Sequence, residues 1–210
     1  MDEQTKQREL ELLRERIIEL EGDLGVQPEP WRTQGYYAAY HTLSGFLLGG
    51  IAALVSLLCN IVGSYVWRAS GSLDQHPLRL IQVYLTFPMG EKALSMSNGL
   101  TLTIGCFLYI GMGMLYGMLF QVVFSRFMPS ANVWKRLLMG CALGIAIWIV
   151  NFHLILDWLQ PLLLGGRWIV ELIPSWVAML THVVFGATMA LLYPWGAFTP
   201  YVKITDQPSP

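Results

Sequence analysis

Four long apolar segments restrict what this chain can fold into. They lie at about 42–67, 99–124, 135–157 and 174–194. A helix needs roughly 20 mostly apolar residues to cross the hydrocarbon core of a bilayer. Segments of this length without a polar face do not suit the helices of a soluble core. The sequence therefore predicts an all-α membrane protein with a bundle of four transmembrane helices.

The composition agrees with this fold class. Charged residues make up 13% of the chain, whereas soluble domains contain roughly a quarter. The formal net charge of −1 leaves no basic surplus to neutralise phosphates, so we expect no nucleic-acid partner. Trp134 and Trp158 flank the third segment, as interfacial aromatic residues do in membrane helices.

Hydropathy divides the chain into an arm (1–24), a linker (25–41), a transmembrane domain (42–194) and a tail (195–210). The arm and linker contain no short apolar core followed by a cleavage site, so we expect the first apolar segment to be an uncleaved anchor. Basic residues cluster between the second and third segments. They are Arg126, Lys135 and Arg136. We therefore predict a multi-pass plasma-membrane protein with both termini in the cytoplasm.

The arm is predicted to be a charged helix over 2–24 with an apolar seam. The seam residues recur at spacings of three and four, as in the a and d positions of a coiled coil. They are Leu10, Leu13, Ile17, Leu20 and Leu24. The seam pairs either with a partner in a short coiled coil or with the membrane domain itself. Gly25, Pro28 and Pro30 are expected to end the helix.

Two outer loops are predicted to contain helices that lie in the membrane interface. The first covers 76–90 and gathers its polar residues on one face. They are Arg79, Gln82 and Thr86. The second covers 161–173 and is similarly apolar around a Gly-Gly-Arg stretch. We expect both loops to cap the bundle on its outer side.

Small residues within the apolar segments predict close helix contacts. Helices in lipid gain little from apolar burial, so backbone approach through glycine matters more. The GxxxG pairs are Gly45 with Gly49, Gly113 with Gly117, and Gly140 with Gly144, and the fourth segment pairs Gly186 with Ala190. These spacings indicate packing and carry no catalytic information.

Polar residues inside the segments are the candidate functional residues. Asn60, Asn151, His153 and His182 fall in the outer half of the predicted bundle, and Asp157 lies at its outer edge. Buried polar groups need partners in hydrocarbon, so we expect one polar cluster. Two histidines on antiparallel helices are able to bind the iron of haem b, bind a quinone head group or pass a proton. Alternatively, each bonds a neighbouring helix or a backbone carbonyl.

The sequence contains no nucleophile elbow, phosphate-binding glycine loop or HExxH zinc motif. Its three cysteines stand singly in apolar segments, without histidines at metal-ligand spacing. They are Cys59, Cys106 and Cys141. We therefore expect no enzymatic activity and no bound metal.

Residues 138–194, roughly a quarter of the chain, resemble small four-helix bacterial inner-membrane proteins of uncharacterised, domain-of-unknown-function type. The residues that carry the resemblance are Gly144, Trp148, Asn151, Phe152, Trp176, His182, Phe185, Gly186, Ala190, Leu191, Leu192 and Tyr193. The resemblance implies a four-helix fold in the bacterial inner membrane and gives weight to His182 and Asn151. The arm and the long first loop depart from the compact pattern of this family.

Three functions are compatible with these observations. The leading hypothesis is a non-catalytic membrane subunit or scaffold that packs against a larger membrane complex, such as a respiratory one, or against a second copy. The first alternative is a haem- or quinone-binding redox subunit that uses His153 and His182. The second alternative is a small-solute or ion transporter that uses the polar cluster.

Overall fold

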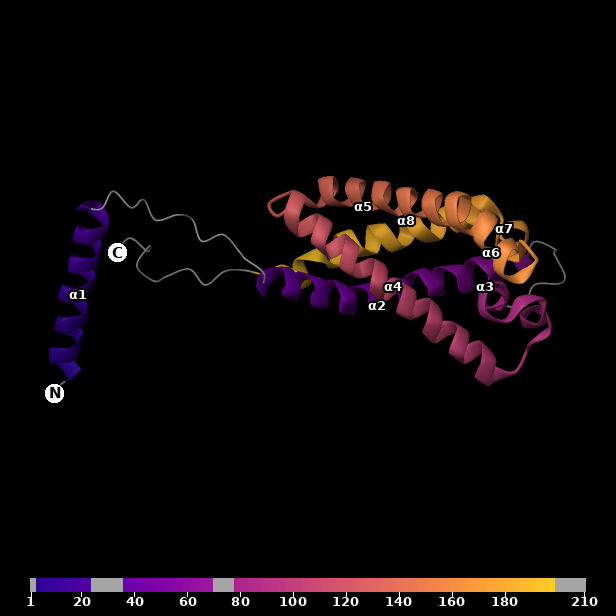
Figure 1. The fold of residues 1–210 in the computed structure, drawn as a ribbon, viewed down its shortest axis with the longest axis horizontal. Coiled ribbons are helices and arrows are strands. Elements are labelled where there is room, and N and C mark those ends of the chain that lie inside the picture. Colours follow the sequence, from indigo (N-terminus) through magenta and orange to yellow (C-terminus); the bar gives the residue numbers. More distant parts are fainter. Residues whose placement is uncertain (1–2, 24–35, 70–77, 199–210) are drawn as a thin grey trace. The chain divides into compact units, whose positions relative to one another are not determined.

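The computed structural model describes residues 3–23, 36–69 and 78–198 (Figure 1). They divide into two compact units, Met1–Tyr36 and Tyr37–Pro210. All the secondary structure in the described residues is helical. The prediction of an all-helical chain with four long apolar helices is confirmed.

The first unit contains the helix α1 (Glu3–Asp23). Its seam residues are exposed by 45 to 58%. They are Leu10, Leu13, Ile17 and Leu20. Leu24 and residues 25–35, which include the glycine and prolines expected to stop the helix, lie outside the described residues. The linker was predicted to continue to residue 41, and in the structure the next helix begins at Tyr36. Residues 36–41 contain no glycine or proline to interrupt a helix.

Within its described residues, the second unit contains four helices that are long and apolar enough to cross a membrane. These segments are Tyr37–Gly63, Gly99–Phe127, Val133–Leu164 and Ser175–Gly196. They correspond to α2 (Tyr36–Ala69), α4 (Gly99–Phe127), α5 (Val133–Trp148) with its continuation, and α8 (Ser175–Leu192) with η3 (Tyr193–Gly196). The continuation of α5 consists of a π-helical segment, η2 (Ile149–Ile155), and α6 (Leu156–Leu164).

Asparagine and glycine residues fix where several helices begin and end. Asn98 precedes α4 and its side chain accepts a hydrogen bond from the amide of Thr101 at 2.8 Å. Asn132 precedes α5 and accepts from the amide of Lys135 at 3.0 Å. These bonds satisfy amides that have no partner in the first turn of a helix. Gly165 follows α6 with a φ of 77°, a left-handed conformation that favours glycine.

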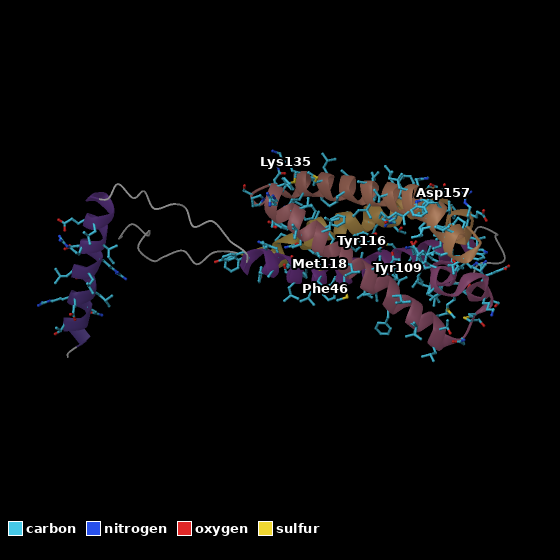
Figure 2. The ribbon with its side chains drawn as sticks, in the orientation of Figure 1. Phe46, Tyr109, Tyr116, Met118, Lys135 and Asp157 are labelled. Atoms are coloured by element: carbon cyan, nitrogen blue, oxygen red, sulfur yellow. The ribbon has the colours of Figure 1, made fainter. Side chains whose placement is uncertain are left out.

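The two ends of the second unit differ in structure. We call one the basic end, because it carries Arg126, Lys135 and Arg136 around the turn between α4 and α5. We call the other the capped end, because short helices gather there. They are α3 (Arg79–Met89), η1 (Gly90–Ser95), α6 and α7 (Trp168–Leu172). Figure 2 shows Lys135 and Asp157 at these opposite ends.

Glycines bring the backbones of α2 and α4 into direct contact. Cβ atoms added to Gly49 and Gly117 would lie 2.8 Å or less from backbone atoms of the other helix. Gly45 and Gly113 extend the same crossing along both helices. Larger side chains at these positions would force the two backbones apart, so the contact depends on the absence of a side chain.

A second glycine contact joins α5 and α8. A Cβ on Gly186 would lie 2.8 Å from the carbonyl carbon of Gly140, and a Cβ on Gly144 would meet the carbonyl oxygen of His182. Figure 1 shows these two helices side by side, while α4 crosses α2 and leans away from α5 towards the capped end. The four long helices therefore pack mainly as two pairs.

The helix α3, which was predicted to lie in the membrane interface, packs against other elements of the second unit and buries five of its residues. Gln82 and Thr86, which share the polar face of this helix, are 5% and 0% exposed. The amide of Gln82 donates to the carbonyl of Met96 at 2.7 Å, and Thr86 accepts from the amide of Gln160 at 2.9 Å. These partners allow a polar face to be buried. Residues 76–77, the expected start of this helix, lie outside the described residues.

Apolar side chains of residues 36–69 and 78–198 pack into three clusters. One lies near the basic end and includes Phe120, Phe124 and Met189. The other two lie on either side of α3, which contributes Ile81 to one and Val83 to the other. The helix α3 therefore separates the capped end into two packed regions.

We predict that Gly117→Ala lowers the free energy of unfolding by about 1–3 kcal/mol, because the new methyl group overlaps the backbone of α2. Gly111 lies in the same helix, and a Cβ there meets nothing within 4 Å. Gly111→Ala is therefore the control, with an expected change below about 1 kcal/mol. Chemical unfolding in mixed detergent micelles measures both. Equal losses would contradict the backbone contact.

Candidate binding cavity

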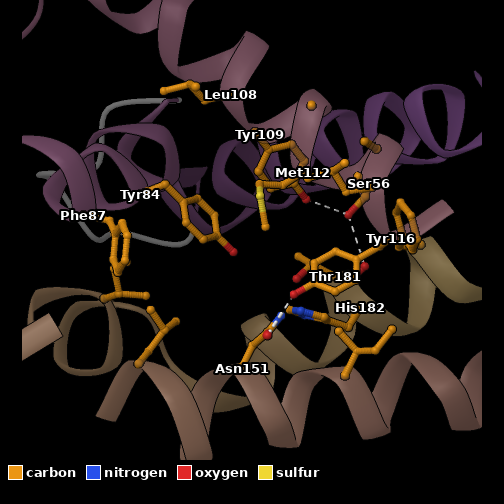
Figure 3. Close-up of a pocket in the computed structure, with 18 of the residues that line it drawn as sticks. Ser56, Tyr84, Phe87, Leu108, Tyr109, Met112, Tyr116, Asn151, Thr181 and His182 are labelled. Atoms are coloured by element: carbon orange, nitrogen blue, oxygen red, sulfur yellow. Dashed lines mark hydrogen bonds between the residues drawn. The ribbon is translucent and has the colours of Figure 1, made fainter. Parts of the chain in front are cut away.

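A cavity of about 790 Å³ lies among α2, α3, α4, η2 and α8. This volume falls within the range of roughly 300–1,000 Å³ that holds small-molecule ligands in proteins. Most of its lining is apolar, as in most small-molecule sites, and includes Phe120, Ile147, Phe152 and Phe185. The polar groups that line it come from α2, α3, α4, η2 and α8, so the fold of the whole unit forms the site (Figure 3).

Exposed apolar side chains also line the cavity and form its opening. On α4 they are Phe107, Leu108, Met112 and Leu115, which are 50 to 69% exposed. Ile155 of η2 and Phe87 of α3 are likewise exposed. The opening therefore lies beside a helix that is apolar enough to cross a membrane.

A chain of hydrogen bonds crosses from α4 to α8 at one wall of the cavity. Ser56 bonds both the carbonyl of Thr181 at 3.1 Å and the hydroxyl of Tyr109 at 2.9 Å. A carbonyl only accepts, so the single proton of Ser56 goes to Thr181 and Tyr109 donates to Ser56. Asn60 donates to the carbonyl of Ser56 at 3.1 Å. The protons of Ser56 and Tyr109 are thus used within the protein.

A second hydrogen bond links α4 to the π segment. The hydroxyl of Tyr116 donates to Oδ1 of Asn151 at 2.8 Å. In Figure 3 both side chains border the cavity close to His182. This bond connects the two helices whose backbones diverge, so it spans the space between them.

His182 is held in one tautomer by its own helix. Its Nδ1 lies 2.7 Å from the carbonyl oxygen of Ala178. Because a carbonyl accepts, Nδ1 of the neutral ring carries the proton and Nε2 has a free lone pair. Among the described residues Nε2 has no hydrogen-bond partner, and the ring lines the cavity. The cavity therefore contains a fixed hydrogen-bond acceptor.

Tyr84 supplies a donor from α3. Its ring lies 5.5 Å from that of Tyr109, and its hydroxyl points into the cavity in Figure 3. Burial, followed by the neighbouring phenols of Tyr109 and Tyr116, raises the pKa of Tyr84 above its ordinary value. The hydroxyl stays protonated at neutral pH. It makes no hydrogen bond to another described residue and is available to a ligand.

The predicted polar cluster is brought together in part. Asn151 and His182 line the cavity, and Asn60 donates to the carbonyl of Ser56, the residue at the centre of the hydrogen-bond chain. Asp157 instead pairs with Arg167 at the capped end, where both side chains are nearly half-exposed. His153 is exposed and does not line the cavity.

His153 lies within the π-helical segment η2, and its side chain points outward. A π-helix bonds i to i+5 and places more residues in a turn than an α-helix, so it changes which side chains face inward. Phe152 is 4% exposed, whereas the His153 ring packs on the outside against Trp148, with centroids 5.0 Å apart. The structure does not bring His153 and His182 to one site that a haem iron would bridge.

Comparison with family models, with curated proteins and with solved structures gave no match to this chain. The resemblance of residues 138–194 to four-helix inner-membrane proteins therefore stays a prediction. Within the described residues no group of three or more His, Cys, Asp or Glu side chains is arranged to hold a metal ion.

Sequence reasoning missed several residues of the site. They are Ser56, Tyr84, Tyr109, Tyr116 and Thr181. A signal existed for two of them, because Tyr109 and Tyr116 stand seven residues apart, on one helical face, deep within an apolar segment. Tyrosines that anchor a membrane interface lie at the ends of a helix. Their central position indicated partners inside the protein.

The side chain of Gln160 links the short helices at the capped end. It is fully buried; its amide nitrogen donates to Thr86 at 2.9 Å, and its oxygen accepts from the amide of Ile169 at 3.0 Å. One side chain thus ties together α3, α6 and α7. Because Ile169 and Phe152 share an apolar cluster, this tie also positions the wall of the cavity.

We predict that Gln160→Leu lowers the free energy of unfolding by about 1–3 kcal/mol, because it leaves the buried amide of Ile169 without a partner. Gln121 is the matched control. It is also fully buried, and neither polar atom of its side chain bonds a described residue. Gln121→Leu should preserve or raise stability. Chemical unfolding and hydrogen exchange at Ile169 test the difference, and equal effects would refute it.

Proposed function

We propose that this chain is a non-catalytic, multi-pass membrane protein that holds a lipid-soluble molecule in its cavity. The observation that carries the proposal is the apolar opening beside α4. A cavity with such an opening receives molecules from the hydrocarbon phase more readily than from water, because its mouth offers few polar contacts to a hydrated solute.

The proposed setting is a plasma membrane, and specifically the bacterial inner membrane. Four helices of sufficient length and hydropathy support insertion. The cluster of Arg126, Lys135 and Arg136 supports a cytoplasmic basic end. Both chain termini then lie in the cytoplasm, and the cavity, which includes Tyr84 and Ile169 near the capped end, lies in the outer half of the membrane.

We predict that the protein, purified from its own membranes in mild detergent, carries a lipid-soluble molecule that Gly111→Phe displaces. Gly111 lines the cavity and has open space around its Cβ position. A phenyl group there should therefore fill the cavity and lower occupancy at least about tenfold. Mass spectrometry of extracted lipids measures the occupancy.

Gly63→Phe is the matched control, because Gly63 also has open space around it and does not line the cavity. It should retain the molecule. An equal lipid profile in both variants, or no molecule bound in the wild-type chain, would refute the proposed function.

The second candidate function is that of a subunit or scaffold in a larger membrane assembly, and α1 supports it. A row of exposed apolar side chains on a charged helix is suited to pairing with another helix. The partner would be another membrane subunit, such as one of a respiratory complex, or a second copy of this chain. This role is compatible with a ligand in the cavity.

We predict that Ile17→Glu removes a stoichiometric partner chain from the purified protein, because the change places a charge in the apolar seam. Association should weaken at least about tenfold. Leu12→Glu is the control: Leu12 is 65% exposed on the same helix but lies off the seam. Size exclusion with light scattering and mass spectrometry gives the stoichiometry. A wild-type chain that purifies alone, or equal losses in both variants, would contradict this role.

A further inference from the structure

The cavity is built for an uncharged head group. No Lys, Arg, Asp or Glu occurs among the described residues that line it. A phosphate or carboxylate enclosed by such a lining would lose its hydration without gaining an opposite charge, which is strongly unfavourable. Fatty acids and phospholipid head groups therefore fit the site poorly.

The cavity-lining groups without a hydrogen-bond partner in the described residues define which donors and acceptors a matching head group must have. The hydroxyl of Tyr84 is a donor that points into the cavity. Nε2 of His182 is an acceptor, because Nδ1 donates to Ala178. A matching head group accepts at one oxygen and donates at another. Both side chains are held in place. Tyr84 packs against Tyr109, and His182 is fixed by the hydrogen bond from Nδ1 to the carbonyl of Ala178 in the same helix.

Aromatic side chains surround these polar groups. Those inside the cavity include Tyr109, Tyr116, Phe120, Phe152 and Phe185, and Phe87 and Phe107 stand at its opening. Aromatic faces and edges pack favourably against a flat ring. Beyond them, Leu108, Met112 and Leu115 line the opening with flexible apolar surface suited to a hydrocarbon tail.

We infer that the cavity binds a lipid whose head group is an uncharged ring bearing two oxygens, of the isoprenoid quinone and quinol class. A ring oxygen accepts from Tyr84, and in the reduced form a ring hydroxyl donates to Nε2 of His182. The tail leaves through the opening beside α4. This inference rests on the proposed function and names the class of its ligand. It concerns binding alone and assigns no electron transfer to the protein.

The test is saturation binding to the full chain in phosphatidylcholine nanodiscs, with empty nanodiscs as background. The probes are a decyl-substituted benzoquinone, its hydroquinone, 1-decanol and ionised decanoate. Both ring compounds should bind at least about tenfold more tightly than the two ringless compounds, since these lack the stacking surface and the second oxygen.

Two conservative variants test the two proposed hydrogen bonds to the ligand separately. His182→Asn keeps a donor for Ala178 but removes Nε2, and the side-chain oxygen of Asn, which sits on Cγ, does not reach the Nε2 position. The variant should therefore weaken hydroquinone binding about tenfold and leave benzoquinone binding nearly unchanged. Tyr84→Phe should weaken binding of both forms. The controls are His153→Asn and Tyr40→Phe, which change the same residue types outside the cavity and should have no effect.

The outcomes distinguish the ligand class from the proposed function. If 1-decanol binds as tightly as the ring compounds and Gly111→Phe blocks it, the cavity binds lipids but the ring-specific inference is wrong. If His182→Asn weakens both redox forms equally, or no more than His153→Asn does, the acceptor assignment is wrong. If no probe binds saturably and Gly111→Phe changes nothing, both proposals fail.

Discussion

Direct contact between helix backbones at the glycine positions holds together the second unit, which contains the four long helices. The contact of Gly49 with Gly117 joins α2 to α4, and that of Gly140 with Gly186 joins α5 to α8. Apolar side chains facing lipid provide little driving force for helix association, so contacts of this kind define which helices pair. Because α4 pairs closely with α2, and α5 with α8, the backbones of α4 and α5 diverge beyond their connecting turn. The cavity occupies the space where they diverge.

Polar groups determine the shape of that space. Hydrogen bonds from Tyr109 to Ser56 and from Tyr116 to Asn151 tie α4 to its neighbours, and Gln160 fixes the short helices at the capped end. In an apolar interior each of these bonds is expensive to break, because a lost partner is not replaced by water. Among the polar groups that line the cavity, Nε2 of His182 and the hydroxyl of Tyr84 have no hydrogen-bond partner in the described residues. Nε2 of His182 and the hydroxyl of Tyr84 are therefore informative about a ligand, whereas the satisfied groups are informative about the fold.

Much of the fold was predictable because its causes are local in sequence. Hydropathy located all four long helices, and the Lys and Arg cluster marked the turn between the second and third. The site was predictable only in part. Asn151 and His182 were identified because a polar side chain within an apolar segment is conspicuous. Tyr84 was not, since its helix was expected to lie in the membrane interface, and local sequence did not indicate that Gln82 and Thr86 of this helix are buried.

The sequence by itself determined that this chain forms apolar helices of membrane-spanning length and where most of them begin and end. It did so because length, hydropathy and capping act between residues close together along the chain. Only the tertiary structure decided how each helix is rotated. The π segment directs Phe152 inward and leaves His153 exposed, and the packing of α8 places His182 at the cavity. Rotation depends on contacts between residues far apart in sequence, which no local pattern specifies.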